Sequence, residues 1–429
     1  MGKGLFAVEA HGSTVGREVV GGATTFVALS YIVFVQPAVL SAPPCGMDAG
    51  AVMFATCVCS AFACFVMGLA ANLVSGVLFL GMSFLGLRRA LMEAVPRGLQ
   101  LAIAAGIGLL IAVVGLRWAG IVVDHPVLYM QLGTLKNPVT MLSLAGLGVT
   151  GVLLARGVRG GLLLGMVLTA AGGWAATRWW HVEPALVSSA AWGQLPDVGA
   201  TVGAAIGGLR TLLDRPVQTV ALVLFTFLLL DVFDTVGTLI GLGHQSGLMK
   251  DGKLPRAREA LFADALGTIA GTLVGTSTIT SYVESSAGVA AGARTGLAAC
   301  VTGVLLLASL IAYPFVGVFG TQVLVDGRVL HPALGEGAVS CYPVIAPVLI
   351  LIGCMMASVV RDIEWKDLSE ALPAFLTVVI MPLSSSITDG IAWGFISYAV
   401  IKLFSKRARE CPAIVYAVSV LFVVYYVVR

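Results

Sequence analysis

Four acidic residues lie inside apolar stretches of this 429-residue chain. Asp231 and Asp234 stand three residues apart in FTFLLLDVFDTVGTLIGLG, so both project from nearly one helical face. Asp264 follows in LFADALGTIAG, and Glu284 follows in SYVESSAG. An ionisable side chain inside a bilayer costs at least about 2.5 kcal/mol and marks a candidate functional site. Alternatively, Asp231 and Asp234 could lie at a solvated helix end. The apolar run continues beyond them through Leu239 to Leu242, which argues against this alternative.

These acids are suited to two kinds of chemistry. Burial and a like charge nearby make a carboxyl group hold its proton more readily, so such groups can carry a proton or attract a cation. A carboxylate also accepts two N–H bonds in one plane, which suits a neutral, flat, hydrogen-bonding solute. The sequence therefore predicts a site that binds a small solute and couples it to a cation.

The element that must position Glu284 is the stretch GTSTITSYVESSAGVAAGARTG, residues 275–296. Thr276 to Val283 is a polar, β-branched run typical of a strand. The small-residue segment after Glu284 is too short to cross a bilayer, and Gly288, Gly292 and Gly296 permit close packing or unwinding. Non-helical backbone survives at membrane depth only where protein or a water-filled cavity satisfies it. A strand that breaks into a half-helix beside a buried acid is typical of a transporter binding site.

Two further positions predict interrupted helices. Gln36 and Pro37 in FVQPAVL either break the first apolar helix opposite the site or mark its end. Asp389 follows the polar run SSSIT and predicts a break between two half-helices.

Composition places the chain in a membrane. It is 58% hydrophobic and 11% charged, whereas soluble domains average about 25% charged residues. Its net charge of +3 is too small to indicate a nucleic-acid partner. The eight cysteines have no metal-ligand spacing, and no cofactor is expected. There is no Walker motif, Gly-x-Ser-x-Gly or HExxH, so the sequence favours neither an ATP-driven pump nor an enzyme.

Apolar windows and charged loops together predict the topology. The windows are 19–40, 51–71, 99–123, 139–155, 161–177, 217–243, 259–274, 297–319, 342–360, 370–386 with 390–404, and 412–428. Clusters of Lys and Arg place the loops near residues 88–97, 156–159, 250–258, 361–366 and 402–409 in the cytoplasm, with both termini, and the loops 124–138 and 181–215 outside.

One segment does not fit this topology. Leu73 to Leu87 is apolar but only 15 residues long, which covers roughly 22 Å of a core about 30 Å thick. A single span here would place Arg88, Arg89 and Arg97 on the wrong side of the membrane. Either the segment is re-entrant or a spanning partner is missing.

Long motifs resemble one transporter family. The motifs are AHGSTVGREVVGGATTF (10–26), DVFDTVGTLIG (231–241), the whole run 253–296, and DIEWKDLSEALPAFLTVVIMPLSSSITDGIAWGFISY (362–398). They are similar to the nucleobase:cation symporters of the nucleobase–ascorbate transporter superfamily, and in particular to the guanine/hypoxanthine/adenine permease branch. The resemblance covers nearly the whole chain.

This resemblance implies an all-α polytopic membrane fold with an inverted 7+7 segment repeat. Short strands of the third and tenth segments would pair at mid-membrane. The core domain would comprise 1–98 and 216–320, and the gate domain 99–215 and 321–429. The implied substrate-binding residues are Asp234, Glu284, Thr238, Tyr282 and Val283, and those implied for cation coupling are Asp264 and Asp231.

The chain departs from the family at one place. Asn72 passes directly to what resembles the end of the fourth segment, so some 30 residues of the third segment are expected to be missing near 72–73. This is where the charge topology also fails. The missing piece would supply the strand opposite Thr276 to Val283, and an unpaired strand edge in a membrane is costly.

The resemblance implies import of a purine nucleobase with H⁺, or alternatively Na⁺, across the inner (cytoplasmic) membrane by a homodimer. Two alternatives stay open. One is a degenerate relative that does not transport, because the third segment is missing. The other is a pyrimidine or anion carrier of the same fold, although an anion carrier would favour a cation where Glu284 stands. No feature of the sequence fixes which purine is preferred.

Overall fold

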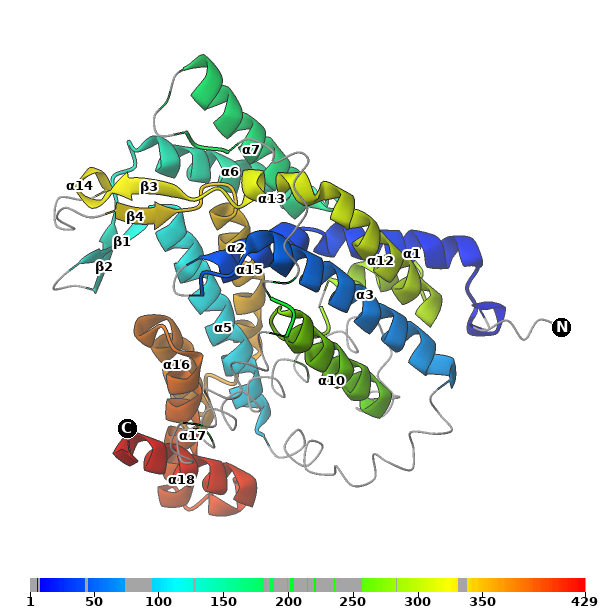
Figure 1. The fold of residues 1–429 in the computed structure, drawn as a ribbon. Helices are drawn as coiled ribbons and strands as arrows, with labels where there is room; N and C mark the ends of the chain where they lie inside the picture. Colours follow the sequence, from blue (N-terminus) through cyan, green and yellow to red (C-terminus); the bar gives the residue numbers. More distant parts are fainter. Residues whose placement is uncertain are drawn as a thin grey trace. The chain divides into compact units, whose positions relative to one another are not determined.

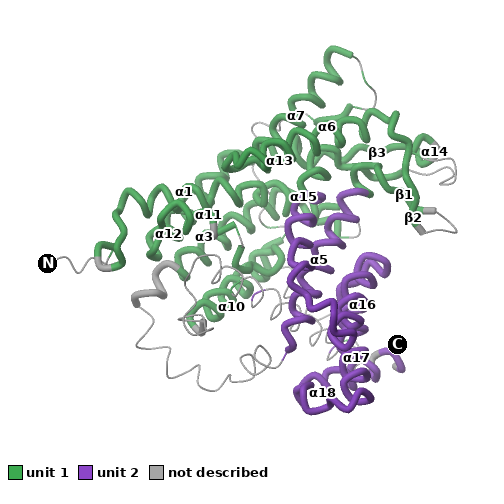
Figure 2. Tube along the Cα trace, turned by 180° about the vertical axis from the view of Figure 1, so that it is seen from behind, with its two compact units in different colours: residues 1–81, 117–214, 238–348 green, residues 82–116, 215–237, 349–429 purple. Residues whose placement is uncertain are grey.

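The computed structural model describes most of the chain. The described residues are 6, 8–42, 45–73, 95–125, 129–180, 182, 185–188, 199, 201–203, 214, 220, 235, 239, 257–282, 284–330 and 338–428. The chain divides into two compact units, drawn in green and purple in Figure 2. Unit 1 comprises residues 1–81, 117–214 and 238–348, and unit 2 comprises 82–116, 215–237 and 349–429. The predicted core and gate boundaries stay a prediction.

Helices dominate both units (Figure 1). Unit 1 contains η1 (Val8–His11), α1 (Val15–Leu29), α2 (Ile32–Ser41), α3 (Ala49–Leu73), α6 (Pro138–Ala155), α7 (Gly161–Trp179), α10 (Ala257–Val274), α11 (Ser285–Ala290), α12 (Gly296–Ala308), η4 (Ser309–Phe315), α13 (Val316–Phe319) and α14 (Gly327–Leu330). Most of α5 (Arg97–Trp118) and of α15 (Ala346–Ala357) belongs to unit 2, together with η6 (Ser358–Asp362), α16 (Leu368–Ser384), α17 (Ile387–Phe404), η7 (Ala408–Glu410) and α18 (Ala413–Val428).

Six helical stretches within the described ranges are long and apolar enough to cross a membrane. They are Val15–Ser41, Ala49–Met67, Arg97–Trp118, Pro138–Ala155, Gly296–Phe319 and Ile387–Phe404. Each overlaps a window predicted from the sequence, which confirms a helical polytopic membrane protein. The window 217–243 falls almost wholly outside the described residues, as does most of 73–87.

Within the described residues, strands form two antiparallel pairs, both in unit 1 (Figure 1). β1 (Val122–His125) pairs with β2 (Tyr129–Leu132), with Val122 opposite Leu132. β3 (Val323–Asp326) pairs with β4 (Ala338–Cys341), with Val323 opposite Cys341. Residues 276–282, where the sequence predicts a strand, are non-helical but form no ladder with any described residue. A strand needs a partner, and the partner expected for this one belongs to the segment predicted to be missing.

Helix α3 lies at the centre of the packing in unit 1. It contacts α2, α10 and α12, and α12 also packs against α1 (Figure 1). Small residues allow these close approaches, because Gly22 on α1 lies against the backbone and side chains of Ala298 and Val301 on α12. Helices α2, α3 and α10 each supply a side chain that contacts the non-helical segment after α10.

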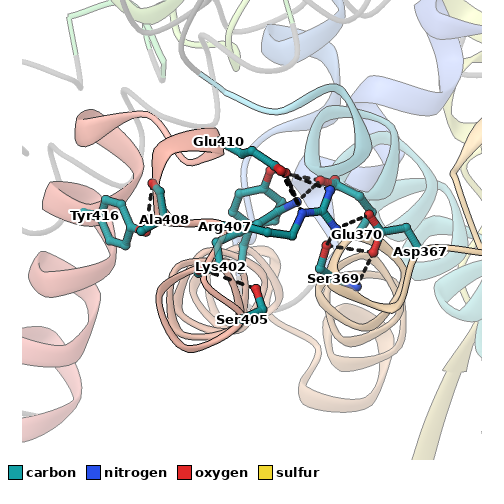
Figure 3. Close-up of polar contacts among 10 residues, drawn as sticks. Asp367, Ser369, Glu370, Lys402, Ser405, Arg407, Ala408, Glu410 and Tyr416 are labelled. Atoms are coloured by element: carbon teal, nitrogen blue, oxygen red, sulfur yellow. Dashed lines mark hydrogen bonds and ion pairs between the residues drawn. The ribbon is translucent and has the colours of Figure 1, made fainter.

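Unit 2 has its own apolar core and a polar cluster at one end of it. Phe395 of α17 packs on Phe422 of α18 with ring centroids 6.2 Å apart, in a cluster of buried side chains from α5, α16, α17 and α18. At the carboxyl end of α17, the buried Lys402 donates to Glu370 at 2.9 Å and to Glu410 at 3.0 Å (Figure 3). Together these contacts fix the ends of α16, α17 and η7 to one another.

Arg407 extends this cluster to the start of α16. Its guanidinium contacts Asp367 at 2.6 Å and Glu410 at 2.7 Å (Figure 3). The hydrogen bond from Arg407 holds the pKa of the Asp367 carboxyl at about 2, and Asp367 also accepts from the backbone N–H of Ser369 as the N-cap of α16. The basic residues used to predict topology are thus partly neutralised by ion pairs in the folded unit.

Candidate binding site

The non-helical segment begins where a glycine ends α10. Gly275 has φ +100°, and the N–H groups of Gly275 and Thr276 both bond to the carbonyl of Gly271 at 2.9 Å. A side chain at Gly275 would meet the carbonyl oxygen of Thr201 at 2.7 Å, so both conformation and space require glycine. The chain then runs without regular structure to a turn in which the Ser285 N–H bonds to the Tyr282 carbonyl at 3.1 Å.

Glu284 stands at the N-cap of the half-helix α11 and makes no side-chain cap to it. Its carboxylate is held from the opposite direction, because Tyr31 donates its phenol to Glu284 Oε1 at 2.7 Å. Tyr31 lies in the break between α1 and α2. The first apolar helix is therefore interrupted, but at Ser30 and Tyr31 rather than at the predicted Gln36 and Pro37, which continue within α2.

Two more side chains from α2 and α3 contact the non-helical segment. Gln36 Nε2 donates to Ser277 Oγ, and Thr56 Oγ1 lies 3.0 Å from Thr276 Oγ1. These side-chain contacts attach the start of the non-helical segment to α2 and α3.

The far end of α11 is held by Glu18, which is fully buried on α1. Its carboxylate accepts the backbone N–H groups of Arg294 at 2.8 Å and Thr295 at 3.2 Å, just before α12. The Arg294 guanidinium in turn donates to the Val289 carbonyl at 2.8 Å. Gly292, with φ +106°, makes the reversal between the two helices, in keeping with the unwinding that the sequence permits there.

Gly288 sets the approach of α11 to α1. A Cβ at this position would overlap Thr25 Oγ1 and lie 2.7 Å from the Gly21 carbonyl. We expect Gly288→Ala to lower the free energy of unfolding by about 1–3 kcal/mol, since overpacking forces the backbones apart. The melting midpoint of the detergent-purified protein measures this.

Gly148→Ala is the matched control, because a methyl group added to this glycine of α6 would have no neighbouring atom within 4 Å. That substitution removes a helix-weakening residue and should leave the melting midpoint unchanged or slightly raised. Equal midpoints for Gly288→Ala and the unchanged protein would contradict the tight α1–α11 contact.

A cavity of about 340 Å³ lies beside α11 within unit 1. Its walls include residues of α1, α2, α3, α10, the non-helical segment, α11 and α12. The polar lining includes Asp264, which is 3% exposed, the hydroxyl residues Ser60 and Ser281, and Arg294. Most of the remaining wall is apolar, so the cavity suits a small solute that is apolar apart from a few polar groups.

The structure brings part of the predicted site together. Asp264 and Tyr282 line the cavity, and Glu284 lies between the lining residues Tyr282 and Ser285. The predicted residues Asp231, Asp234, Thr238 and Val283 lie outside the described part of the chain. Among the residues that are described, no group of three or more His, Cys, Asp or Glu side chains could hold a metal ion.

Three residues near the site were not singled out from the sequence, namely Tyr31, Glu18 and Arg294. Glu18 and Arg294 stand within quoted motifs, and an acid in the first turn of an apolar helix was the available signal for Glu18. Asp389 lies where the sequence predicts a helix break, because α16 ends at Ser384 and α17 begins at Ile387. Its carboxylate accepts the Tyr426 phenol at 2.9 Å.

Sequence comparisons connect this architecture to known proteins. A family model described as a permease family matches residues 69–324. The chain is similar to the guanine/hypoxanthine permease PbuG of Bacillus subtilis, with 35% identity over 99% of this chain and 99% of that protein. It is also similar to the adenine permease AdeP of Escherichia coli, with 32% identity over 98% of this chain and 94% of that protein. The putative permease MJ0326 of Methanocaldococcus jannaschii is 35% identical over 98% of this chain and 97% of that protein.

Two solved structures have a similar fold. The transmembrane domain of the cyanobacterial bicarbonate transporter BicA matches with a TM-score of 0.51 and 13% identity, over 87% of this chain and 97% of that one. SLC26A9 matches with a TM-score of 0.54 and 11% identity, over 91% of this chain and 65% of that one. Both share the inverted 7+7 repeat that the resemblance implies, and at this identity the likeness concerns the fold alone.

Proposed function

Because the chain belongs to the nucleobase–ascorbate transporter family, we propose that it imports a purine nucleobase together with a cation. Members of this family are transporters rather than enzymes. The observation that carries the proposal is the acid Glu284 at the start of a half-helix whose first residue, Ser285, lines the same cavity as Asp264. Relatives named as guanine/hypoxanthine and adenine permeases support a purine as the solute.

In this proposal Glu284 and Asp234 hold the base. A purine presents ring and exocyclic N–H groups along one edge, and a carboxylate accepts two such groups in plane. Tyr282, Thr238 and Val283 line the pocket around it. The apolar walls of the cavity cover the faces of the ring, which excludes water and strengthens the polar contacts.

Asp264 couples the base to the cation, with Asp231 as a second acid. Asp264 is buried on α10 and lines the same cavity as Tyr282. A buried carboxyl that takes up a proton loses its charge, so protonation can change how firmly neighbouring groups hold the solute. We propose H⁺ as the cation, with Na⁺ as the alternative. Movement of a core domain against a gate domain would expose the site to each side in turn, in a homodimer of the inner membrane with cytoplasmic termini.

The degenerate alternative also has an observation in its favour. The match to PbuG runs over 466 aligned positions, more than the 429 residues of this chain, so that relative carries residues with no counterpart here. This supports the proposal that a third segment is missing near residues 72–73. The contacts from Gln36 and Thr56 favour transport nonetheless, since they hold Ser277 and Thr276 of the non-helical segment in place.

Uptake by this chain decides between the alternatives. In a bacterial host without its own purine permeases, we expect saturable uptake of radiolabelled guanine, hypoxanthine or adenine that a protonophore abolishes. A second chain with a purine permease's third segment inserted between Asn72 and Leu73 is the comparison. Uptake by the restored chain alone would establish the degenerate alternative, and uptake of uracil but not purines would establish the pyrimidine alternative.

A further inference from the structure

We propose that Tyr31 is the positioning residue of the binding site, holding the Glu284 carboxylate where it receives the base. This inference rests on the proposed function and names a group that deepens it. It follows from one hydrogen bond between the two interrupted helices, Tyr31 Oη to Glu284 Oε1 at 2.7 Å.

Glu284 needs an external support. It precedes a half-helix of six residues and follows a segment without regular structure, and its carboxylate makes no cap to α11. A glutamate side chain has several rotatable bonds, and holding it in one geometry costs conformational entropy. Without a fixed partner the carboxylate would sample many positions, and each binding event would have to order it.

Tyr31 is suited to supply this support. It is 4% exposed, and it sits at the break where the N–H of Phe34 bonds to the Tyr31 carbonyl at 3.1 Å in a tightened turn. The rigid ring has few rotatable bonds, so the position of the phenol follows from the position of the backbone. The break between α1 and α2 therefore fixes a donor opposite the start of α11.

The chemistry of the pair leaves the acid able to bind a solute. A phenol is a neutral donor, so it holds the acid without placing a cation beside it, as Lys or Arg would. A carboxylate offers about four acceptor positions, and one phenol occupies one of them. Tyr282 and Ser285, which precede and follow Glu284 in the chain, line the cavity, and in this proposal the remaining acceptor positions receive the base.

Gln36 supports the same arrangement from further along α2. Its contact with Ser277 fixes the start of the segment, while Tyr31 fixes its end. Two side chains from α2 and its N-cap thus hold both ends of the segment that leads to the acid.

Tyr31→Phe tests the inference, because it removes the hydroxyl and keeps the ring. We expect the Michaelis constant for purine uptake to rise about tenfold, as for a lost hydrogen bond to a charged group, while the maximal rate stays within about twofold. Tyr416→Phe is the matched control, since its phenol contacts the Ala408 carbonyl in unit 2, outside the site. It should leave both constants unchanged.

Hydrogen–deuterium exchange of the purified proteins gives a readout that does not depend on transport. In Tyr31→Phe, peptides spanning residues 276–290 should exchange several-fold faster, while peptides of α17 should exchange as before. An unchanged Michaelis constant would overturn the role of Tyr31, and so would a fall in maximal rate with unaltered exchange at residues 276–290. Either result would leave the proposed function standing. Absence of uptake by the unchanged chain would overturn the proposed function, and the substrate-positioning role with it.

Discussion

Glu284→Gln is expected to abolish purine uptake while leaving the protein folded in the membrane. The amide has nearly the same shape as the carboxylate, and its oxygen can still accept the Tyr31 phenol. What it loses is the charge and one of the two acceptor atoms, and its NH₂ group would face the N–H groups of the base. Hydrogen bonds to a charged group contribute about 1.5–3 kcal/mol each, so the loss predicts a fall in uptake efficiency of about 100-fold or more.

The measurement is initial-rate uptake of labelled purine, normalised to the amount of protein in the membrane. Glu364→Gln makes the same chemical change at an exposed position and should transport normally. Saturable uptake by Glu284→Gln at the unchanged rate would remove Glu284 from the mechanism, whatever the fate of the other acids.

Lys402→Met should destabilise unit 2 more than any surface substitution. The side chain of Lys402 is 1% exposed and contacts two carboxylates, Glu370 at 2.9 Å and Glu410 at 3.0 Å. Methionine fills a similar volume, but it leaves Glu370, whose side chain is 19% exposed, without its cation. Removing one partner of a buried ion pair costs about 3–5 kcal/mol, and the partial exposure of both acids places this case near the lower figure.

A melting midpoint lowered by several degrees in detergent would show this effect. Lys366→Met is the control, because Lys366 is exposed and its replacement should cost less than about 0.5 kcal/mol. Adding Glu370→Gln to Lys402→Met should recover part of the loss, since it removes the uncompensated charge. If Lys402→Met and Lys366→Met have the same melting midpoint, the buried ion pair does not stabilise unit 2.

Two of the chain's interruptions could be predicted because they depend on local chemistry, whereas the break at Ser30 and Tyr31 lies away from the predicted Gln36 and Pro37. The β-branched run after Gly275 disfavours helix, and the polar run before Asp389 ends one, so both breaks are found where the sequence places them. The predicted strand is not formed with any described residue, because pairing depends on a second segment. Local propensity indicates an extended backbone at Thr276 to Tyr282, but it does not supply the partner.

Contacts distant in sequence were missed for a related reason. Tyr31 in SYIVFVQP has the appearance of an ordinary apolar helix residue, and nothing near it indicates that its hydroxyl meets Glu284. From the sequence, only the positive charge of Lys402 and Arg407 could be used, and it served to predict the topology. Their partners Glu370 and Asp367 stand at the start of another helix, and a single sequence does not show which acid meets which base.

The paired state of Lys402 and Arg407 has a consequence for how the protein is made. A membrane segment is oriented during synthesis, before Lys402 and Arg407 meet Glu370 and Asp367, so under the predicted topology both cations would count toward retention in the cytoplasm. Afterwards the same charges are neutralised by Glu370, Asp367 and Glu410 as the helices assemble. Replacing these acids by amides would therefore leave the orientation of the nascent chain intact and affect only the later association of its helices.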